Sequence, residues 1–460
     1  MSAPGAGSTD EIAVVGGGLA GCLLTCFLAR RGYRVTVYER RPDPRTATPE
    51  RGRSINLALS ERGLDALRRI GLAEQVLADA LPMRGRMLHP VAGAPRFQSY
   101  SAAGDRAINS ISRGALNNAL LDAAQAAPGV TLRFEHRLTA LDPATGALTH
   151  ETPAGPVHTR AEVVLGTDGA GSAVRAALRE RGLLDERVEF LEYGYKELSI
   201  PARAGEFALD PGALHIWPRG TSMMIALPNP DRSFTATLFW PTEGPGSFAA
   251  LADPASVRRH FDTHYPDVPL LAPDLAEDYR LNPVGQLGTV RASSWRAGGR
   301  VGLLGDAAHA IVPFYGQGAN CAFEDVVELD RCLTDTGTGP DSGAGTRSRW
   351  AAALELFERR RRDNTEAIAR MALANFVEMR DKVSSPLFQL GRRVEHGLER
   401  VLPGRYVSRY ELVSFSTTPY AQVQRRVARQ HRALAGVSAV LLAGLAAGTL
   451  GTRFGAARRR

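Results

Sequence analysis

The chain has 460 residues, of which 44% are hydrophobic and 23% charged, so it is long enough for two or three domains with sizeable cores. Its net charge of +8 lies at one end, because eight arginines and no acidic residue follow position 424. Residues 1–424 are therefore formally neutral, which argues against a basic, nucleic-acid-binding body.

The four cysteines form no CxxC pair and no cluster with histidines at metal-ligand spacing. We therefore expect reduced, structural thiols and no metal site. The first ten residues are small and polar, so we expect no secretory signal and a cytoplasmic protein.

The N-terminal region has the pattern of a strand, a glycine-rich turn, a helix and a second strand. Residues 11–15 are apolar, a helix is expected over residues 19–31 with Gly32 as a left-handed cap, and alternating valines in residues 34–39 predict the second strand. This order is typical of a dinucleotide-binding βαβ unit.

The turn after the first strand contains the pattern Gly16-x-Gly18-x-x-Gly21. Gly16 permits a tight turn, Gly18 lets a pyrophosphate approach the backbone, and Gly21 lets the helix pack closely on the strand. The first amides of the helix attract phosphate, and Glu39, which ends the second strand, can accept hydrogen bonds from ribose hydroxyls. These features together predict a dinucleotide site rather than a chance glycine turn.

The rest of the chain alternates helical and β-prone stretches. We expect helices over residues 62–80 and 113–127, strands over residues 215–217, 223–227, 234–239 and 300–304, and mainly helix from residue 350 onward. Turns rich in proline, glycine and asparagine separate the three strands between 215 and 239, which predicts an antiparallel meander and a second domain.

Two later segments repeat the strand, turn and helix order. Asp168 stands in the turn of residues 163–175, and the strand that begins residues 301–324 ends at Gly305 and Asp306. Asp306 can bind hydroxyl groups, and the first amides of the helix that begins near residues 316–320 can face an anionic group. Each segment alone is equally well interpreted as an ordinary capped turn.

Taken together and in this order, the three segments resemble the single-component flavoprotein aromatic hydroxylases, the family of para-hydroxybenzoate hydroxylase, over residues 11–325. The resemblance implies bound FAD, NADPH as a transient co-substrate, and hydroxylation of an aromatic ring with O2 through a flavin C4a-hydroperoxide. It also implies an α/β fold, with a Rossmann-like FAD-binding domain of the para-hydroxybenzoate hydroxylase type, an inserted and mainly antiparallel β-sheet substrate domain, and a C-terminal helical segment.

The domain boundaries implied by the family assign residues 8–80, 109–185 and 286–348 to the FAD-binding domain. The substrate domain comprises residues 81–108 and the β-sheet of residues 186–285, and a helical region with a basic tail follows over residues 349–460. The family's flavin contacts fall on Gly16, Gly18, Ala20, Gly21, Tyr38, Glu39, Arg40, Arg41, Ala58, Arg113, Leu138, Asp168, Gly305, Asp306, Ala319 and Asn320.

Five longer segments resemble, more closely, the branch of this family that hydroxylates kynurenine. They are residues 52–59, 83–89, 194–201, 214–228 and 375–382. The resemblance implies that L-kynurenine is converted to 3-hydroxy-L-kynurenine, in tryptophan catabolism and pyridine nucleotide biosynthesis.

The substrate contacts of that branch fall on Arg86, Tyr100, Asn375 and Tyr410. Arg86 can hold a carboxylate with two hydrogen bonds, and the tyrosines and the amide can add further ones. Each residue alone would be interpreted as a surface ion pair or a core tyrosine, and only the joint match favours a site.

Three further residues, Phe239, Pro313 and Phe314, could enclose the aromatic ring of the substrate and exclude water. Because the substrate's own amine activates its ring, we expect no catalytic dyad. Gln317 is the one candidate for a hydrogen bond to the substrate carbonyl or to the peroxide.

The sequence departs from the family pattern at Tyr315, Ala319 and Thr167, where relatives commonly have Phe, Met and Ala. Tyr315 and Ala319 lie beside the expected flavin, so hydroxylation of another aromatic or kynurenine-like compound is the alternative function. A disulfide reductase would need a redox CxxxxC pair and a second Rossmann unit. A non-catalytic flavin-binding protein would not need the four substrate contacts Arg86, Tyr100, Asn375 and Tyr410.

The C-terminal tail contains 20 consecutive uncharged residues, 433–452, between arginines. This length could span a bilayer, and Gly444-x-x-x-Gly448 would suit close helix packing. Alanine and glycine dominate, however, so insertion would be weak. Two interpretations therefore stay open for residues 433–460, namely membrane contact or a soluble helix that closes over the substrate site.

Overall fold

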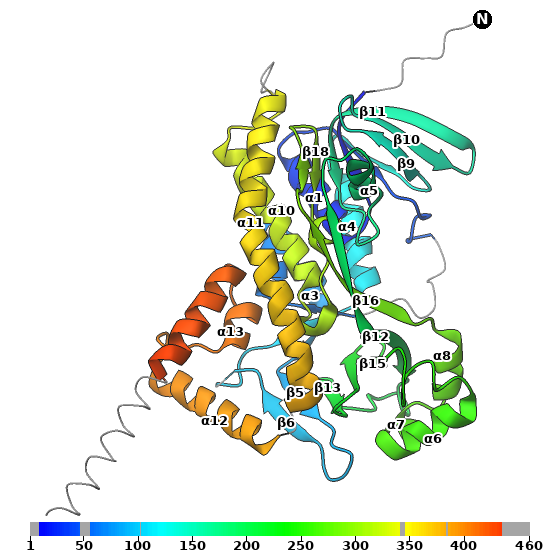
Figure 1. Cartoon of the computed structure of the whole chain (residues 1–460), viewed down its shortest axis with the longest axis vertical. Coiled ribbons are helices and arrows are strands. Elements are labelled where there is room, and N and C mark those ends of the chain that lie inside the picture. Colours follow the sequence, from blue (N-terminus) through cyan, green and yellow to red (C-terminus); the bar gives the residue numbers. More distant parts are fainter. Residues whose placement is uncertain (1–8, 47–55, 102, 341–345, 383–384, 435–460) are drawn as a thin grey trace, which may run out of the picture.

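The computed structural model describes residues 9–46, 56–101, 103–340, 346–382 and 385–434. Its largest sheet has eight strands, with the expected first strand, β1 (Thr9–Val15), near the middle. Strands β9, β10, β11 and β18 of this sheet are labelled in Figure 1. Parallel to β1 lie β2 (Val35–Tyr38) on one side and β11 (Gly155–Gly166) on the other. The sheet continues through β8 (Val130–Arg133) beyond β2, through β18 (Val301–Leu303) and β17 (Arg296–Ala297) beyond β11, and through the hairpin strands β9 (Arg137–Asp142) and β10 (Ala147–Thr152).

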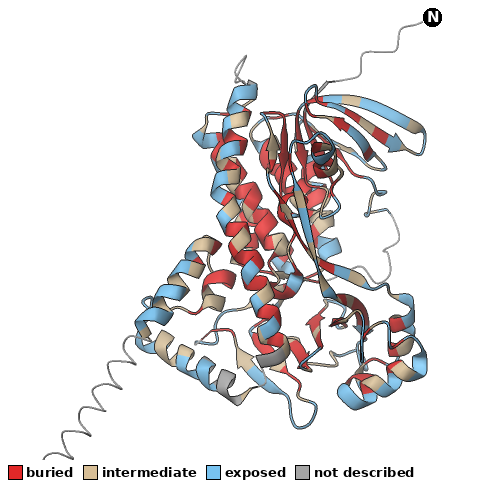
Figure 2. Cartoon of the chain, in the orientation of Figure 1, coloured by how far each residue is buried: buried red, intermediate tan, exposed pale blue. Residues whose placement is uncertain are grey.

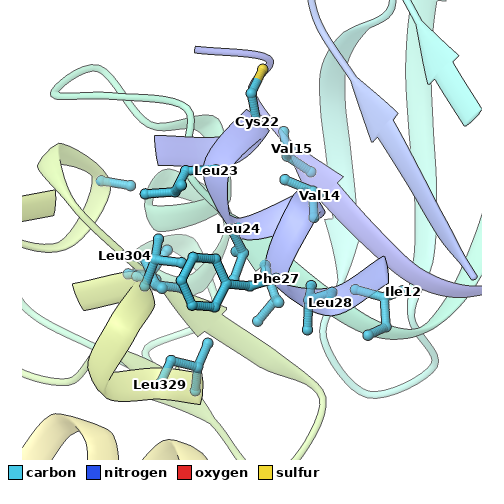
Figure 3. Close-up of a cluster of buried hydrophobic side chains, with 14 of the residues drawn as sticks. Ile12, Val14, Val15, Cys22, Leu23, Leu24, Phe27, Leu28, Leu304 and Leu329 are labelled. Atoms are coloured by element: carbon cyan, nitrogen blue, oxygen red, sulfur yellow. The ribbon is translucent and has the colours of Figure 1, made fainter. Parts of the chain in front are cut away.

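Helices cover this sheet and make its central strands fully buried. Residues 12–15 of β1 and all of β2 are buried, as expected for a parallel sheet with both faces covered. The close-up in Figure 3 shows Phe27 and its neighbours on α1 (Leu19–Arg30) packed beside β1 and against Leu304 and Leu329. Further helices pack on α1, namely α4 (Arg113–Ala126) and α10 (Gly318–Asp335), and the long α11 (Thr346–Val377) lies along α10.

Two expectations about helix ends have different outcomes. The left-handed conformation expected of Gly32 is confirmed by its φ of 89°. The single helix expected over residues 62–80 is wrong, because Gly71 adopts a φ of 79° and divides the stretch into α2 (Glu61–Ile70) and α3 (Ala73–Ala78).

The second sheet has seven strands and contains the expected meander. Its order is β16 (Gly285–Ala292), β12 (Glu186–Ile200), β15 (Phe234–Pro241), β14 (Met223–Pro228), β13 (Ala213–Pro218), β5 (Gly85–Leu88) and β6 (Arg96–Ser99). The antiparallel pairing of β13, β14 and β15 confirms the meander. Because β5 pairs in parallel with β13, Arg86 stands beside Leu214.

The two faces of the meander have different neighbours. One face, which includes Met224, Leu238 and Trp240, belongs to a core shared with α6 (Pro254–His264), α7 (Val268–Leu271) and α8 (Leu275–Leu281). The alternate residues therefore face the other way, because successive side chains of a strand point to opposite sides.

Most of the buried residues lie between the sheets and the helices that cover them (Figure 2).

Shorter elements complete the structure. A small sheet contains β3 (Leu57–Leu59), β7 (Ile108–Ile111) and β4 (Leu81–Met83). The remaining helical elements are α5 (Ala173–Glu180), α9 (Asp306–His309), η1 (Pro313–Tyr315), the π-helical η3 (Glu378–Lys382), α12 (Pro386–Val401), α13 (Arg409–Ser414) and a helix over residues 420–434.

Among the described residues, we find no helix with the length and apolar character needed to cross a membrane. The tail for which the sequence left membrane contact or a covering helix open lies outside these residues from position 435 onward.

We predict that His150 makes the fold sensitive to acid. Its side chain is fully buried and stacked on Tyr38, and this burial, with a smaller effect of His136, lowers the pKa of His150 to about 4 from 6.5. The unfolded chain therefore binds a proton that the folded chain does not bind between these values. Stability from this residue is present above pH 6.5 and is lost as the pH falls toward 4, by about 2 kcal/mol at pH 5 and roughly 3 kcal/mol over the whole range.

The measurement is the free energy of unfolding in urea at pH 7.5 and pH 5. In His150→Phe, which keeps a ring against Tyr38, the loss on acidification should be smaller than in the wild type. His158→Gln serves as the control, because His158 is exposed on the neighbouring strand β11. Equal acid sensitivity of wild type and His150→Phe would contradict the prediction.

Candidate active site

One cavity of about 680 Å³ is lined both by the glycine turn after β1 and by the face of the meander opposite α6–α8. Its volume lies in the range of small-molecule and cofactor sites. Of the residues that the sequence indicated, those that line it are Gly16, Gly18, Ala20, Tyr38, Glu39, Arg40, Arg41, Ala58, Arg113, Leu138, Asp168, Asp306, Ala319, Arg86, Tyr100, Asn375, Tyr410, Phe239, Pro313 and Phe314. The structure thus brings most of the expected flavin contacts and the expected substrate contacts into a single cavity, and Gly21, Gly305 and Asn320 are the expected flavin contacts that do not line it.

The three glycines of the turn have different surroundings. Gly16 has a φ of 107°, and a Cβ there would lie 2.7 Å from the carbonyl oxygen of Thr167. A Cβ at Gly21, which does not line the cavity, would lie 1.9 Å from the carbonyl oxygen of Gly16, so a side chain there would separate helix from strand. At Gly18 a Cβ would meet nothing within 4 Å, and this glycine lines the cavity at the start of α1. Gly18 therefore leaves room for a ligand against the helix N-terminus.

Glu39 supports the glycine turn from the end of β2. One carboxylate oxygen accepts a hydrogen bond from the amide of Gly17 at 2.8 Å, and the other accepts from the amide and the Nε of Arg41 at 3.0 and 2.8 Å. Burial alone would raise the pKa of Glu39, but these hydrogen bonds outweigh it and lower that pKa. Glu39 is thus a carboxylate that lines the cavity and also holds the turn.

Asp168 has the capping role that the sequence gave as the alternative. Its carboxylate accepts hydrogen bonds from the hydroxyl of Ser172 at 2.5 Å and from the amides of Ala173 and Val174 at 2.7 and 3.2 Å, where α5 begins. Burial nevertheless raises the pKa of Asp168 against these hydrogen bonds. Asp168 therefore both caps α5 and lines the cavity.

Asp306, at the start of α9, lines the cavity, where its side chain is exposed. Desolvation by the surrounding protein raises the pKa of its carboxyl, and the nearby Arg113 opposes the effect. Gly305 lies just behind the cavity lining and donates its amide to Asp325 at 2.9 Å. A carboxyl in this position suits hydroxyl groups of a ligand, which it can bind as an acceptor.

The first turn of α10 closes the same side of the cavity. Gly318 and Ala319 line it, and the amides of a first helical turn have no partner within the helix. Asn320 is buried behind them, where it donates to the carbonyl oxygens of Ala58 and Gly316 at 2.9 and 2.8 Å and accepts from the amide of Ser60 at 3.0 Å. Asn320 thus fixes the helix N-terminus against α2 rather than lining the cavity.

The opposite side of the cavity contains a buried cationic clamp. The guanidinium of Arg86, on β5, lies 4.9 Å from the ring centroid of Tyr410 and 5.9 Å from that of Tyr100, and the two rings are stacked at 4.7 Å. Arg86 is only 9% exposed, its Nε has no hydrogen-bond partner, and no described carboxylate forms an ion pair with it. A buried cation of this kind is stabilised by a bound anion.

The two tyrosines of the clamp keep their protons. Burial raises the pKa of both phenols, although Arg86 opposes the effect. Burial alone would lower the pKa of Arg86, but the surrounding tyrosines and the carboxylate of Glu378 outweigh it and raise that pKa. The clamp therefore offers a guanidinium and two protonated phenols, which also share a hydrogen bond with each other.

Aromatic rings form part of the cavity wall. Phe314 stacks on Phe376 at 4.0 Å and meets Phe239 edge-on at 5.0 Å. Asn375 donates its side-chain amide to the carbonyl oxygen of Phe314 at 2.7 Å and to the sulfur of Met379 at 3.0 Å. The wall is consequently fixed to α11.

The structure does not bring Gln317 into the cavity lining. Gln317 is buried, and its side-chain oxygen accepts a hydrogen bond from the hydroxyl of Tyr420 at 2.9 Å. This oxygen is engaged with the C-terminal region, and a hydrogen bond to a carbonyl oxygen would need the side-chain amide nitrogen of Gln317, which does not line the cavity.

The sequence analysis did not identify several of the residues that line the cavity. They share an inward position on the sheet strands and are Met223, Ile225, Leu227, Thr237, Leu214 and Tyr195. The spacing of two along β14 and β15 was the available signal, because such residues share one face of a strand. That spacing does not indicate which of the two faces meets a cavity.

The chain matches the model of the FAD binding domain family over residues 9–346. It is similar to kynurenine 3-monooxygenase of Myxococcus xanthus strain DK1622, with 50% identity over 89% of this chain and 87% of that protein. It is also similar to kynurenine 3-monooxygenase of Stenotrophomonas maltophilia strain K279a, with 45% identity over 92% and 91%.

Among solved structures, the fold is similar to that of tetrameric 2-methyl-3-hydroxypyridine-5-carboxylic acid oxygenase, with a TM-score of 0.65, 23% identity and coverage of 83% of this chain and 95% of that one. It is also similar to that of p-nitrophenol 4-monooxygenase from Pseudomonas putida DLL-E4, with a TM-score of 0.66, 22% identity and coverage of 85% and 94%. At these identities the likeness concerns the fold alone.

The glycine turn gives a paired prediction. Gly18→Ala should leave the thermal stability of the FAD-free protein unchanged but weaken FAD binding about tenfold or more, because the added methyl points into open space that a pyrophosphate would use. Gly21→Ala should instead lower the stability of the FAD-free protein, because its methyl meets the Gly16 carbonyl. The measurements are thermal unfolding without FAD and a fluorescence titration with FAD. Wild-type FAD affinity in Gly18→Ala would contradict the assignment of the turn.

Proposed function

This chain belongs to the kynurenine 3-monooxygenase family of FAD-dependent enzymes, and on that premise we propose that Arg86, Tyr100 and Tyr410 hold the carboxylate of L-kynurenine. The chain is an FAD-dependent monooxygenase that hydroxylates kynurenine. The observation that supports the clamp is the buried Arg86 guanidinium, with which no described carboxylate forms an ion pair. A substrate carboxylate supplies the missing charge.

The residues around the glycine turn and the start of α10 are of the kinds that bind FAD. Gly18 and the start of α1 would hold its pyrophosphate, Glu39 and Asp306 would accept hydrogen bonds from its hydroxyl groups, and the first turn of α10 would face its ring system. Bound FAD supplies the redox chemistry that activates O2 for transfer to an aromatic carbon. We propose NADPH as the electron donor, in line with the family.

At the clamp, the protonation states favour binding of an amino acid. Tyr100 and Tyr410 remain protonated, so they can donate to a carboxylate beside Arg86. The side-chain amide of Asn375 is already engaged with Phe314 and Met379. Asn375 therefore has its oxygen left to offer, which suits the ammonium group of the substrate better than its carboxylate.

The aromatic wall would orient the ring of the substrate and exclude water. Phe239, Phe314 and Pro313 line the same cavity as the clamp and the first turn of α10. A ring that lies against them, with its amino-acid end at Arg86, would point its reactive edge toward the FAD side. Exclusion of water from this space limits loss of the activated oxygen before transfer.

The test compares the wild type with Arg86→Ala and Arg84→Ala. In the wild type, L-kynurenine should stimulate NADPH oxidation and yield 3-hydroxykynurenine. Arg86→Ala should retain FAD and raise the KM for kynurenine about 100-fold, because loss of a buried charge-assisted contact costs roughly 3 kcal/mol. Arg84 is exposed two residues away, so Arg84→Ala is the matched control and should have the wild-type KM.

The readouts are initial rates of NADPH oxidation and chromatographic quantification of the product. An unchanged KM in Arg86→Ala would remove Arg86 from the site. Failure of the FAD-loaded wild type to hydroxylate kynurenine, with hydroxylation of a related aromatic amine instead, would favour the alternative substrate.

A further inference from the structure

Arg62 is a buried arginine outside the cavity. Its contacts link the segment that carries Tyr410 to the start of α10. It lies in the first turn of α2, is 2% exposed, and does not line the cavity. Its Nη1 forms an ion pair with Glu324 of α10 at 2.7 Å. A buried arginine with this many partners is costly to desolvate, so its contacts indicate which elements it holds in place.

Most of its hydrogen bonds go to the segment that carries Tyr410. Arg62 donates from Nε to the carbonyl oxygen of Val413 at 3.1 Å, and from Nη2 to the carbonyl oxygens of Leu412, at 3.4 Å, and of Thr418. The last carbonyl groups of a helix have no partner within it, and α13 ends at Ser414. Arg62 therefore closes the end of α13 and ties it to the chain that follows.

The same guanidinium also reaches toward the flavin side. It lies 3.9 Å from the ring centroid of Tyr420, whose hydroxyl donates to Gln317 at 2.9 Å. Gln317 is the N-cap residue of α10, and the next two residues line the cavity. The side chains of Arg62, Tyr420 and Gln317 thus link the substrate clamp to the helix N-terminus that faces the flavin side.

A second anchor holds the other end of α13. Arg409 forms an ion pair with Glu378 of η3 at 2.7 Å. Arg106 approaches Glu411 at 3.6 Å from the outer surface and is half exposed. Of Arg62, Arg409 and Arg106, only Arg62 contacts both the C-terminal segment and α10.

We propose that Arg62 is a positioning residue for hydroxylation, which holds Tyr410 against Arg86 and Gln317 at the start of α10. This inference rests on the proposed function. Without Arg62, kynurenine binds less tightly and the ring is less well placed for oxygen transfer. NADPH, a proton and O2 then give NADP+ and H2O2 in place of hydroxylated product, water and NADP+.

The experiment uses FAD-loaded wild type, Arg62→Met, Arg62→Lys and Arg106→Met. Arg62→Met should retain FAD, raise the KM for kynurenine at least tenfold and increase the H2O2 formed per NADPH consumed. Arg62→Lys keeps a charge beside Glu324 but loses the planar fork, so it should be intermediate. Arg106→Met, which removes an exposed arginine from the same helix, should match the wild type in both measurements.

Two further measurements keep the proposal testable if Arg62→Met does not fold. Tyr420→Phe keeps the ring beside Arg62 but loses the hydrogen bond to Gln317, and it should raise the H2O2 fraction more than the KM. Hydrogen–deuterium exchange of FAD-loaded Arg62→Lys, without substrate, should be faster than in the wild type over residues 409–420 but unchanged in α4.

The outcomes separate this inference from the proposed function. A wild type that does not hydroxylate kynurenine would contradict the proposed function, whereas the exchange measurement would still test the role of Arg62. Wild-type KM and coupling in a folded, FAD-loaded Arg62→Met would overturn the inference. Unchanged exchange over residues 409–420 in Arg62→Lys would overturn it as well.

Discussion

The active site depends on a buried guanidinium that forms no ion pair with a described carboxylate. Arg86 is buried beside Tyr100 and Tyr410 without an acidic partner among the described residues, and the faces of the two rings recover only part of the cost of removing it from water. A buried charge of this kind is retained where a bound ligand supplies the opposite charge. The carboxylate of an amino-acid substrate does so, and the phenols, which keep their protons, add hydrogen bonds to the same group.

Placing this cation near a flavin requires elements that are remote in the sequence. Arg86 reaches the meander because β5 pairs in parallel with β13, and Tyr410 reaches Arg86 because α13 is held at its end by Arg62. The glycine turn after β1 contributes to the same cavity from the other sheet. Neither the glycine turn nor the clamp could perform the reaction alone. The chemistry requires both in one cavity.

Local features of the sequence predicted much of this arrangement. The glycine turn, the acid that ends β2, the meander and the start of α10 each follow from short-range rules, and the structure has all of them. The left-handed conformation of Gly71 was not anticipated, and a single helix was therefore expected through it. The long-range contacts could not be derived in this way. Arg62 meets Val413 across 351 positions, and neither residue lies in a recognisable motif. Gln317 was expected to face the substrate, but Tyr420, a partner 103 positions away, holds its oxygen instead.

The most direct measurement is a crystal structure of the FAD-loaded protein with L-kynurenine. The account predicts that the substrate carboxylate lies within hydrogen-bond distance of the Arg86 guanidinium, and that its ring lies against Phe314 on the side of the cavity that faces the flavin. A carboxylate bound elsewhere, with Arg86 still unpaired, would contradict the central claim.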